Sequence, residues 1–525
     1  MTRIRPRTAA LQGMALGLVT LALISACGSG GSGSGAAPEP KAVTGGTVTI
    51  DLSGPVTSYD PAKGSGFQDA EVAWALYDSL VVTDSDGSFV PGLASSWKIA
   101  PTSATYTLKS GVTCSDGTKV TPTVVAASLR RFLDPATAAP FLAQVTGGNA
   151  ATVTTGANTV TVTLAKPWAG LFPGLASPFA GIICPAGLRD LNSLKTRSAG
   201  TGSFVSASQV AGSNYTFTRR TDYDWGPKYA DQGTGTLPTK LVMQVLTDDN
   251  TRSNLMATSA LQIGAFTSDA WQKFKASKGV KSAISNQTDT FLIFNEAPGH
   301  PTADQRVRKA VEQAVNRQGL NQVQSFGAGS LITNLGQSNY QCFDNSLGNL
   351  IPRYDAGAAG QVLKGRSLNV LGTNVFAGGD ANSYVLSALE AAGVKGTLQN
   401  LDNAAYVQAL FSGTNNWDVA ILGYGNLLSS LLAAGGFFSG HAPPNGQNLG
   451  DVQNPTAAAA LAAAGSATSQ GAECAALSTF QKSLLTNADF LPLSTVPVHV
   501  LFAGGTSGAV VKGFVQPSSI RIAQK

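Results

Sequence analysis

Residues 291–295, Phe-Leu-Ile-Phe-Asn, form an almost unbroken apolar run in the middle of the chain and predict a buried strand. Pro298 and Pro301 end this run, because proline lacks the backbone donor that a sheet requires. Apolar residues then recur at helical spacing between positions 307 and 315. The segment therefore predicts a strand followed by a helix, one unit of an α/β fold.

The expected helix begins at a polar cap and carries several basic residues. Thr302 or Asp304 can accept the hydrogen bonds of its first turn. The basic residues lie largely outside the apolar stripe, so we expect them on a solvated face and not at a phosphate site. They are Arg306, Arg308, Lys309 and Arg317.

Working outward, the same alternation recurs on both sides of this segment. Strands expected at 367–370 and 397–401 flank a helix expected at 382–392, which is a further α/β pattern. Alternating β-branched residues predict a strand at 47–52. Further elements are expected as helices at 70–80, 124–132 and 455–465 and as a strand at 106–109.

The N-terminus has the layout of a secretory signal. Three arginines precede an apolar run from Ala9 to Ala26, and the stretch 24–27 reads Ile-Ser-Ala-Cys. This tetrapeptide resembles the lipobox of bacterial lipoproteins, in which Cys27 would become the first residue and carry a lipid. A plain signal peptide with a chance cysteine and a membrane-spanning helix stay open, although a span needs about 20 apolar residues.

The residues after Cys27 predict a flexible tether. Residues 28–35 are only glycine and serine, and prolines follow up to position 41. The run 28–33 matches the dinucleotide pattern G-x-G-x-x-G, but no βαβ unit surrounds it, so low complexity explains the match.

Size and charge limit the possible classes. Without residues 1–26 just under 500 of the 525 residues remain, enough for two or three domains. The formal net charge is +5, and the three arginines of the leader account for three of these charges, which leaves +2. No cluster of basic and aromatic residues indicates nucleic acid as a partner. No second run after residue 41 is long enough to span a bilayer.

Four cysteines remain besides Cys27, an even number that favours disulfides in an exported protein. Three connectivities are possible. Pairing Cys114 with Cys184 and Cys342 with Cys474 is favoured, because each bridge then stays within one expected domain. Four buried free thiols are the alternative.

Enzyme motifs are absent from the sequence. The three histidines, His300, His441 and His499, lie far apart, and no H-E-x-x-H, G-x-S-x-G or Gly-Lys phosphate loop is present. We therefore expect neither an enzyme nor a cofactor.

Six short runs together resemble one known family. They lie at 59–62, 91–97, 115–118, 200–204, 222–226 and 248–255. In this order they are similar to the extracytoplasmic solute-binding proteins of peptide ABC importers, family 5, which also contains nickel and oligosaccharide binders. The similarity extends from about residue 45 to 522, and each run alone is a weak signal.

The resemblance implies an α/β, two-lobed, periplasmic-binding-protein-like fold of type II, cluster C, with an extra domain in the first lobe. The chain is expected to cross between lobes near 284–290 and 486–492. The expected parts are a signal peptide at 1–26, a lipidated tether at 27–44, a first lobe at 45–71, 200–285 and 490–525, its inserted domain at 72–199, and a second lobe at 286–489.

The resemblance also implies a function and partners. It indicates a monomeric, lipid-anchored receptor on the outer face of the cytoplasmic membrane that delivers a peptide or peptide-like solute to an ABC permease and its ATPase. Its site is expected at Tyr59, Asp60, Tyr424, Gly425 and Asn426.

The segment that would recognise the amino terminus of a peptide departs from the family pattern. In relatives that bind free peptides, an aromatic residue is followed by an aspartate that holds the α-ammonium. Tyr424 matches the aromatic residue, but no acid follows it. We therefore expect that a free amino terminus is not read in the usual way, unless an acid from elsewhere, such as Asp60 or Asp69, compensates.

Three other interpretations stay open. The loop after Tyr424 can pack against the other lobe and bind nothing. A nickel or metal-chelate carrier of the same fold would need His441 or His300 at the cleft. A surface sensor without a transport role is the third.

Overall fold

A central sheet of ten strands runs through the whole body of the protein. The computed structural model describes residues 41–43, 46–413, 416–425, 427–428 and 430–523, all within one unit that extends from residue 37 to the C-terminus. In spatial order the strands are β14 (Lys395–Leu401), β13 (Ser367–Thr373), β15 (Val419–Tyr424), β12 (Lys281–Phe294), β16 (Phe490–Phe502), β11 (Ile263–Phe266), β1 (Thr47–Leu52), β10 (Lys240–Val245), β9 (Asn214–Arg219) and β8 (Phe204–Val210).

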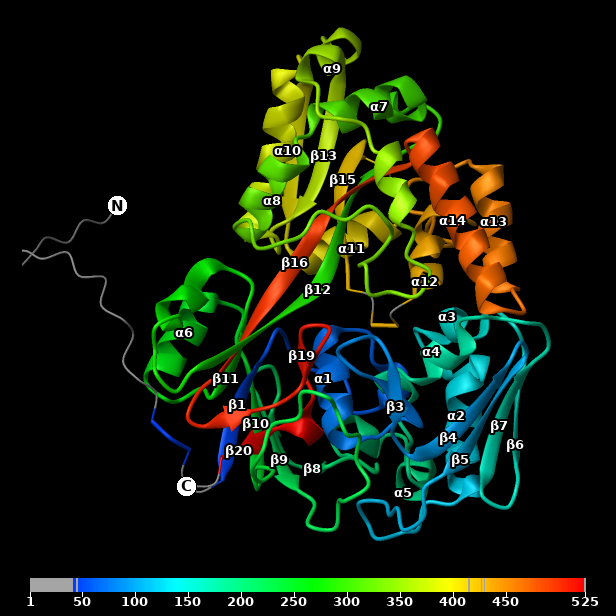
Figure 1. Ribbon diagram of the computed structural model, residues 1–525, viewed down its shortest axis with the longest axis vertical. Coiled ribbons are helices and arrows are strands. Elements are labelled where there is room, and N and C mark those ends of the chain that lie inside the picture. The colour runs from blue at the N-terminus through cyan, green and yellow to red at the C-terminus, as the bar shows by residue number, and fades with distance from the viewer. Residues whose placement is uncertain (1–40, 44–45, 414–415, 426, 429, 524–525) are drawn as a thin grey trace, which may run out of the picture. The chain divides into compact units, whose positions relative to one another are not determined.

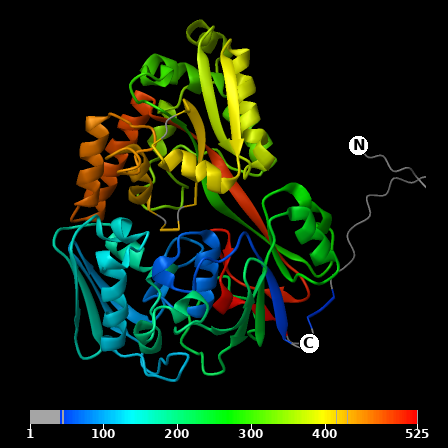
Figure 2. The same cartoon turned by 180° about the vertical axis from the view of Figure 1, so that it is seen from behind.

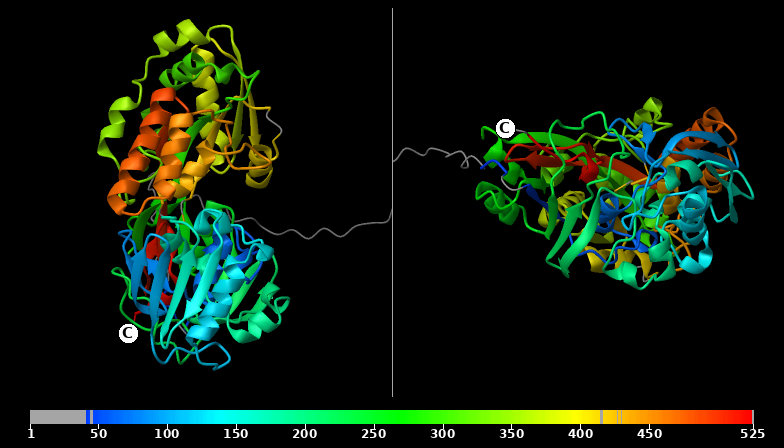
Figure 3. Two further views of the ribbon diagram at one scale, coloured as in Figure 1. Left: turned by 90° about the vertical axis from the view of Figure 1, so that its right-hand side faces the viewer. Right: turned by 90° about the horizontal axis from the view of Figure 1, so that it is seen from below.

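The two long strands in the middle of this sheet join two lobes. β12 and β16 pair antiparallel along most of their length and run between the lower and upper parts of the molecule (Figure 1). β11, β1, β10, β9 and β8 belong to the first lobe, whereas β15, β13 and β14 belong to the second (Figure 1). Seen from the side, the two lobes lie one above the other (Figure 3).

A separate sheet of four strands lies in the part of the first lobe expected as an insert. Its order is β4 (Ala94–Ala100), β5 (Ser103–Leu108), β7 (Thr159–Leu164) and β6 (Ala151–Thr155). Helix α2 (Pro122–Leu133) packs on this sheet, and both are seen from behind in Figure 2. Val125, Leu129 and Phe132 of α2 belong to the same apolar core as Tyr106 of β5.

The strand–helix unit read from residues 291–315 is confirmed. Phe291–Phe294 are the fully buried end of β12, and α7 (Gln305–Ala314) follows with Asp304 as its cap, whose carboxylate accepts from Arg306 N at 2.9 Å. Val307 and Val311 of α7 are 0% exposed, because they cover one face of the second-lobe sheet.

The expected helices and strands elsewhere are also found. They are α1 (Phe67–Leu76), α10 (Asp380–Ala391), α13 (Pro455–Gly465), β1, β5, β13 and β14. The cap of α13 is Asn454, whose side chain accepts from Ala457 N.

The expectation of a solvated basic face is wrong for two of its four residues. Arg306 and Lys309 are exposed, but Arg308 is buried in an ionic cluster. Arg317 is largely enclosed and donates to the carbonyls of Ile332 and Leu493. Helical spacing alone missed these contacts, because the partners lie outside the helices that carry the two arginines, and some, such as Asp489 and Leu493, are far away in sequence.

The favoured disulfide pairing is confirmed. Cys114–Cys184 closes a segment of the first lobe at a sequence separation of 70 residues, and Cys342–Cys474 closes one of the second lobe at a separation of 132. None of the helices in the described part of the chain combines the length and the apolar content that a bilayer crossing requires.

Candidate functional site

The candidate site lies where the two lobes face each other beside the crossing strands. Two cavities meet there, and Gly87 and Asn339 line both of them. The smaller cavity has a volume of about 240 Å³ and the larger one about 400 Å³. Cavities of this size between domains are typical of sites for small organic ligands.

The smaller cavity is largely polar and lies against β12. Ile284, Ser285 and Asn286 of β12 form one wall, and residues 337–340 of the second lobe form another. Lys512 closes it from the C-terminal segment of the first lobe. The side chain of Ile284 is 63% exposed, an apolar surface that an occupant could cover.

The larger cavity brings aromatic rings from the first lobe against the second lobe. Phe89, Trp168 and Phe172 line it from the first lobe, and the second lobe contributes Leu431, residues 467–470, Glu473 and Leu477. Phe89 meets Phe172 edge to face, with ring centroids 4.9 Å apart. Such a wall suits apolar or planar groups of a solute.

Trp168 also forms a direct contact between the lobes. The main-chain N–H of the next residue, Ala169, donates to Gly465 O at the end of α13, at 3.0 Å. A Cβ atom at Gly465 would lie only 2.3 Å from the indole ring, so no larger residue fits there without a shift. The two lobes therefore meet closely at the mouth of the larger cavity.

One ionisable group, Lys512, lines the smaller cavity, and another, Asp289, is buried behind its lining residue Gln337. Asp289 of β12 is 0% exposed, and burial raises the pKa of its carboxyl to about 7. Burial lowers the pKa of the Lys512 ammonium to about 7, and its Nζ donates to Leu427 O. Both groups can therefore gain or lose a proton near neutral pH. Ionisable groups with pKa values shifted in this way cluster at functional sites.

Tyr59 and Asp60, expected at the ligand, have structural contacts. Tyr59 is 2% exposed and packs against Tyr215 and Phe217 in the core of the first lobe. The Asp60 carboxylate accepts from Ala62 N at 3.1 Å and from Arg131 at 2.5 Å. These contacts account for the Asp60 carboxylate and the Tyr59 ring, whereas the buried Tyr59 hydroxyl has no hydrogen-bond partner among the described residues, and the role of both residues toward a solute stays a prediction.

The loop after Tyr424 lies against the first lobe. The Tyr424 ring packs edge to face on Phe437, and burial raises its pKa. A Cβ atom at Gly425 would lie 2.1 Å from the ring of Phe67 in α1. Asn426 lies outside the described residues. The packing of Gly425 agrees with the alternative that this loop serves lobe contact.

The histidines have partners of their own. His300 Nδ1 lies 2.8 Å from Asp418 Oδ1, and the His499 ring stacks on Trp271 with centroids 4.0 Å apart. His441 is exposed in a loop. Across the residues that the structure describes, no three His, Cys, Asp or Glu side chains gather as metal ligands.

A comparison with family models decides the affiliation. Residues 88–431 match the model of the bacterial extracellular solute-binding proteins, family 5. The chain belongs to this family. Its members are solute-binding proteins and not enzymes, so the expected family and the absence of enzymatic function are confirmed.

Relatives of the family 5 protein agree with this. It is 38% identical to the periplasmic oligopeptide-binding protein OppA of Haemophilus influenzae over 96 residues, 18% of each chain. It is 27% identical to the periplasmic murein peptide-binding protein MppA of Escherichia coli over 286 residues, 50% of this chain and 51% of the other. The chain thus spans about half or less of the length of the curated relatives it matches.

One solved structure aligns with nearly the whole family 5 chain. It is a substrate-binding protein from Microbacterium hydrocarbonoxydans in complex with 4-hydroxybenzoate hydrazide, with a TM-score of 0.78 and 30% identity. The alignment covers 91% of this chain and 100% of the other. The predicted two-lobed, periplasmic-binding-protein-like fold is therefore confirmed.

Sequence reasoning missed Gln337, Trp168 and Lys512, which line the cavities, and Asp289, which is buried next to Gln337. For Asp289 a signal was present, because an acid inside a run of strand-forming residues is unusual. The other three come together only through the fold, so nothing in their local sequence indicated them.

Proposed function

We propose that this family 5 protein binds a peptide-like solute outside the cytoplasmic membrane and delivers it to the permease of an ABC importer, with the ATPase as a further partner. The single observation that carries the proposal is the pair of adjoining cavities between lobes joined by β12 and β16. Two-lobed binding proteins close on their ligands by hinge motion of such crossing segments.

The cavities support a peptide-like solute in two ways. The larger one offers aromatic rings for an apolar side chain, and the smaller one offers amides from Asn286, Gln337 and Asn339 that can pair with peptide groups. OppA and MppA, relatives by sequence, are named for binding oligopeptides and murein peptides.

Mass spectrometry of solutes released from the purified protein by denaturation tests this function. We expect one or a few peptide-like compounds, absent from a parallel preparation in which Trp168→Ala and Phe172→Ala remove the aromatic wall. A stoichiometric metal ion without an organic solute would favour the nickel or metal-chelate carrier. Repeated release of a single non-peptide compound would exclude the peptide class.

We further propose that Cys27 carries a lipid that anchors the protein to the outer face of the membrane, and that the protein acts as a monomer. The Ile-Ser-Ala-Cys stretch and the Gly/Ser tether after it support the anchor. Metabolic labelling with a radioactive fatty acid should mark the protein and should fail for Cys27→Ser. An unlabelled wild-type protein in its native host would refute the anchor.

A further inference from the structure

Asp289 is a buried carboxylate without a hydrogen-bond partner. Its side chain is 0% exposed, and neither oxygen forms a hydrogen bond with any residue that the structure describes. The Gln337 amide interacts with the Asp289 carboxyl and lowers its pKa, without a hydrogen bond of ordinary geometry, and one of its two N–H groups donates to Asn286 O at the long distance of 3.4 Å. An isolated buried carboxylate is costly, so its presence calls for a function.

The backbone places Asp289 at the junction of the lobes. It is the residue where β12 begins to pair with β15, opposite Tyr424, while Thr495 of β16 opposes it on the other side. The register of β12 against β16 shifts just before Thr288 and again just after Asp289. Such bulges re-aim side chains and are frequent next to active sites.

The surroundings of Asp289 connect it to the smaller cavity. Gln337 and Tyr340 line that cavity, and both lie within interaction range of Asp289. Tyr424 is a third neighbour. Gln337 and Tyr340 thus contact both the cavity and the surroundings of the carboxylate, and tyrosine rings can also interact with a cation.

Other acids near the site already have partners. Asp60 is paired with Arg131, and Asp69 accepts from the main chain of Thr57, Ser65 and Gly66. Asp84 lines the smaller cavity but accepts from Ser85 N and Ala230 N. Glu473, partly exposed at the larger cavity, is the competing carboxylate.

We propose that Asp289 is the anionic group that binds an amine of the solute, at the junction of the lobes and with Gln337, Tyr340 and Tyr424 around it. The proposal rests on the proposed function and names its substrate class: peptide-like solutes that carry a cationic amine. In this proposal the amine is bound by an acid of the crossing strand β12, because Asp60 and Asp69 already have hydrogen-bond partners.

Three pools of random tripeptides test the proposal by native mass spectrometry and calorimetry. The first has free amino termini and no Lys or Arg, the second is the same pool N-acetylated, and the third is N-acetylated with one Lys in each peptide. The proteins are the wild type, Asp289→Asn and Glu473→Gln, with Asp380→Asn as an exposed control far from the cavities.

We expect the wild type to prefer one amine-bearing pool over the amine-free pool by at least about tenfold, since charge-assisted bonds are the strong ones. Asp289→Asn should abolish this preference while its melting temperature stays equal or rises. A purely structural role would instead lower the melting temperature. The first and third pools distinguish a terminal amine from a side-chain amine.

Other results overturn the proposal. Equal binding of acetylated and free pools, or an unchanged preference in Asp289→Asn, would reject Asp289 while the peptide-binding function stands. If only Glu473→Gln loses the preference, the amine binds in the larger cavity and not at Asp289. If the wild type binds none of the three pools, the proposed peptide class fails, and this proposal fails with it.

Discussion

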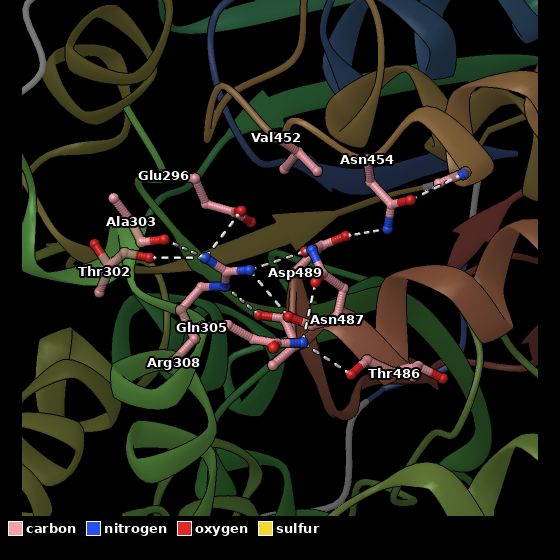
Figure 4. A network of polar contacts seen from close by, with 12 residues as sticks. Glu296, Thr302, Ala303, Gln305, Arg308, Val452, Asn454, Thr486, Asn487 and Asp489 are labelled. Carbon is pink, nitrogen blue, oxygen red and sulfur yellow. Dashed lines mark hydrogen bonds and ion pairs between the residues drawn. The ribbon is translucent and has the colours of Figure 1, made fainter. Parts of the chain in front are cut away.

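Two buried ionic sites lie less than 20 residues apart in sequence and differ in whether the buried charged group has hydrogen-bond partners. The Arg308 cluster lies in the second lobe, beyond the ends of the crossing strands, and every nitrogen of its guanidinium donates (Figure 4). Asp289 lies in the middle of the crossing and donates or accepts nothing among the described residues. The first site secures the fold, whereas the second leaves a charge available.

The Arg308 cluster joins the two chain ends of the second lobe. Its Nη1 lies 3.0 Å from Glu296, just after β12, and its Nη2 lies 3.3 Å from Asp489, just before β16. Further donations reach the carbonyls of Thr302, Asn487 and Ala488 (Figure 4). Asp489 also accepts from Asn454 at 2.7 Å, so the cluster holds both crossing strands where they enter the lobe.

The largest effect is expected when the satisfied site is broken. Arg308→Ala leaves the buried Asp489 carboxylate without its cation and removes the donor to three carbonyls, so it should lower the free energy of unfolding by about 3–5 kcal/mol. Urea denaturation measures this loss. Arg306→Ala, whose side chain is 82% exposed, is the matched control and should change stability by less than about 0.5 kcal/mol. Equal losses in both variants would contradict the comparison.

The unsatisfied site should respond with the opposite sign and should depend on pH. The pKa of Asp289 is raised by burial from 3.8 to about 7, so the folded state favours its protonated form. Its contribution to stability is therefore present below about pH 4 and lost as pH rises through about 7. Asp289→Asn has no carboxyl to deprotonate, so it avoids this loss. The free energy of unfolding of the variant minus that of the wild type should therefore be larger at pH 8 than at pH 4, by up to about 4 kcal/mol.

Thermal unfolding of both proteins at several pH values checks this expectation. A difference between wild type and Asp289→Asn that stays constant with pH would show that the carboxyl has an ordinary pKa. Asp380→Asn, an exposed substitution of the same kind, should show no such dependence.

A smaller effect is expected within the satisfied cluster itself. Burial and the nearby negative charge of Asp489 raise the pKa of Glu296, so the folded state favours its protonated, neutral carboxyl. Glu296→Gln keeps a neutral polar group there and should cost no more than about 1 kcal/mol. A loss as large as that of Arg308→Ala would mean that Glu296 is ionised in the folded protein.

The same two sites show how far sequence reasoning reaches. The strand before Asn295 and the helix capped by Asp304 were predictable, because apolar periodicity and capping are local. Arg308 was assigned to the wrong environment, because part of its environment, the carbonyls of Asn487 and Ala488 and the carboxylate of Asp489, comes from a segment about 180 residues further along the chain. Asp289 was overlooked, because only the fold shows that this acid lacks a partner.

The contact between Trp168 and the end of α13 gives the protein a built-in optical reporter. The indole lies in the first lobe against a glycine of the second, so its emission depends on how closely the lobes approach. Replacing the other five tryptophans by phenylalanine would leave one tryptophan, which can be excited selectively over tyrosine, in the wall of the larger cavity. Arrival of a solute could then be followed in real time without any attached dye.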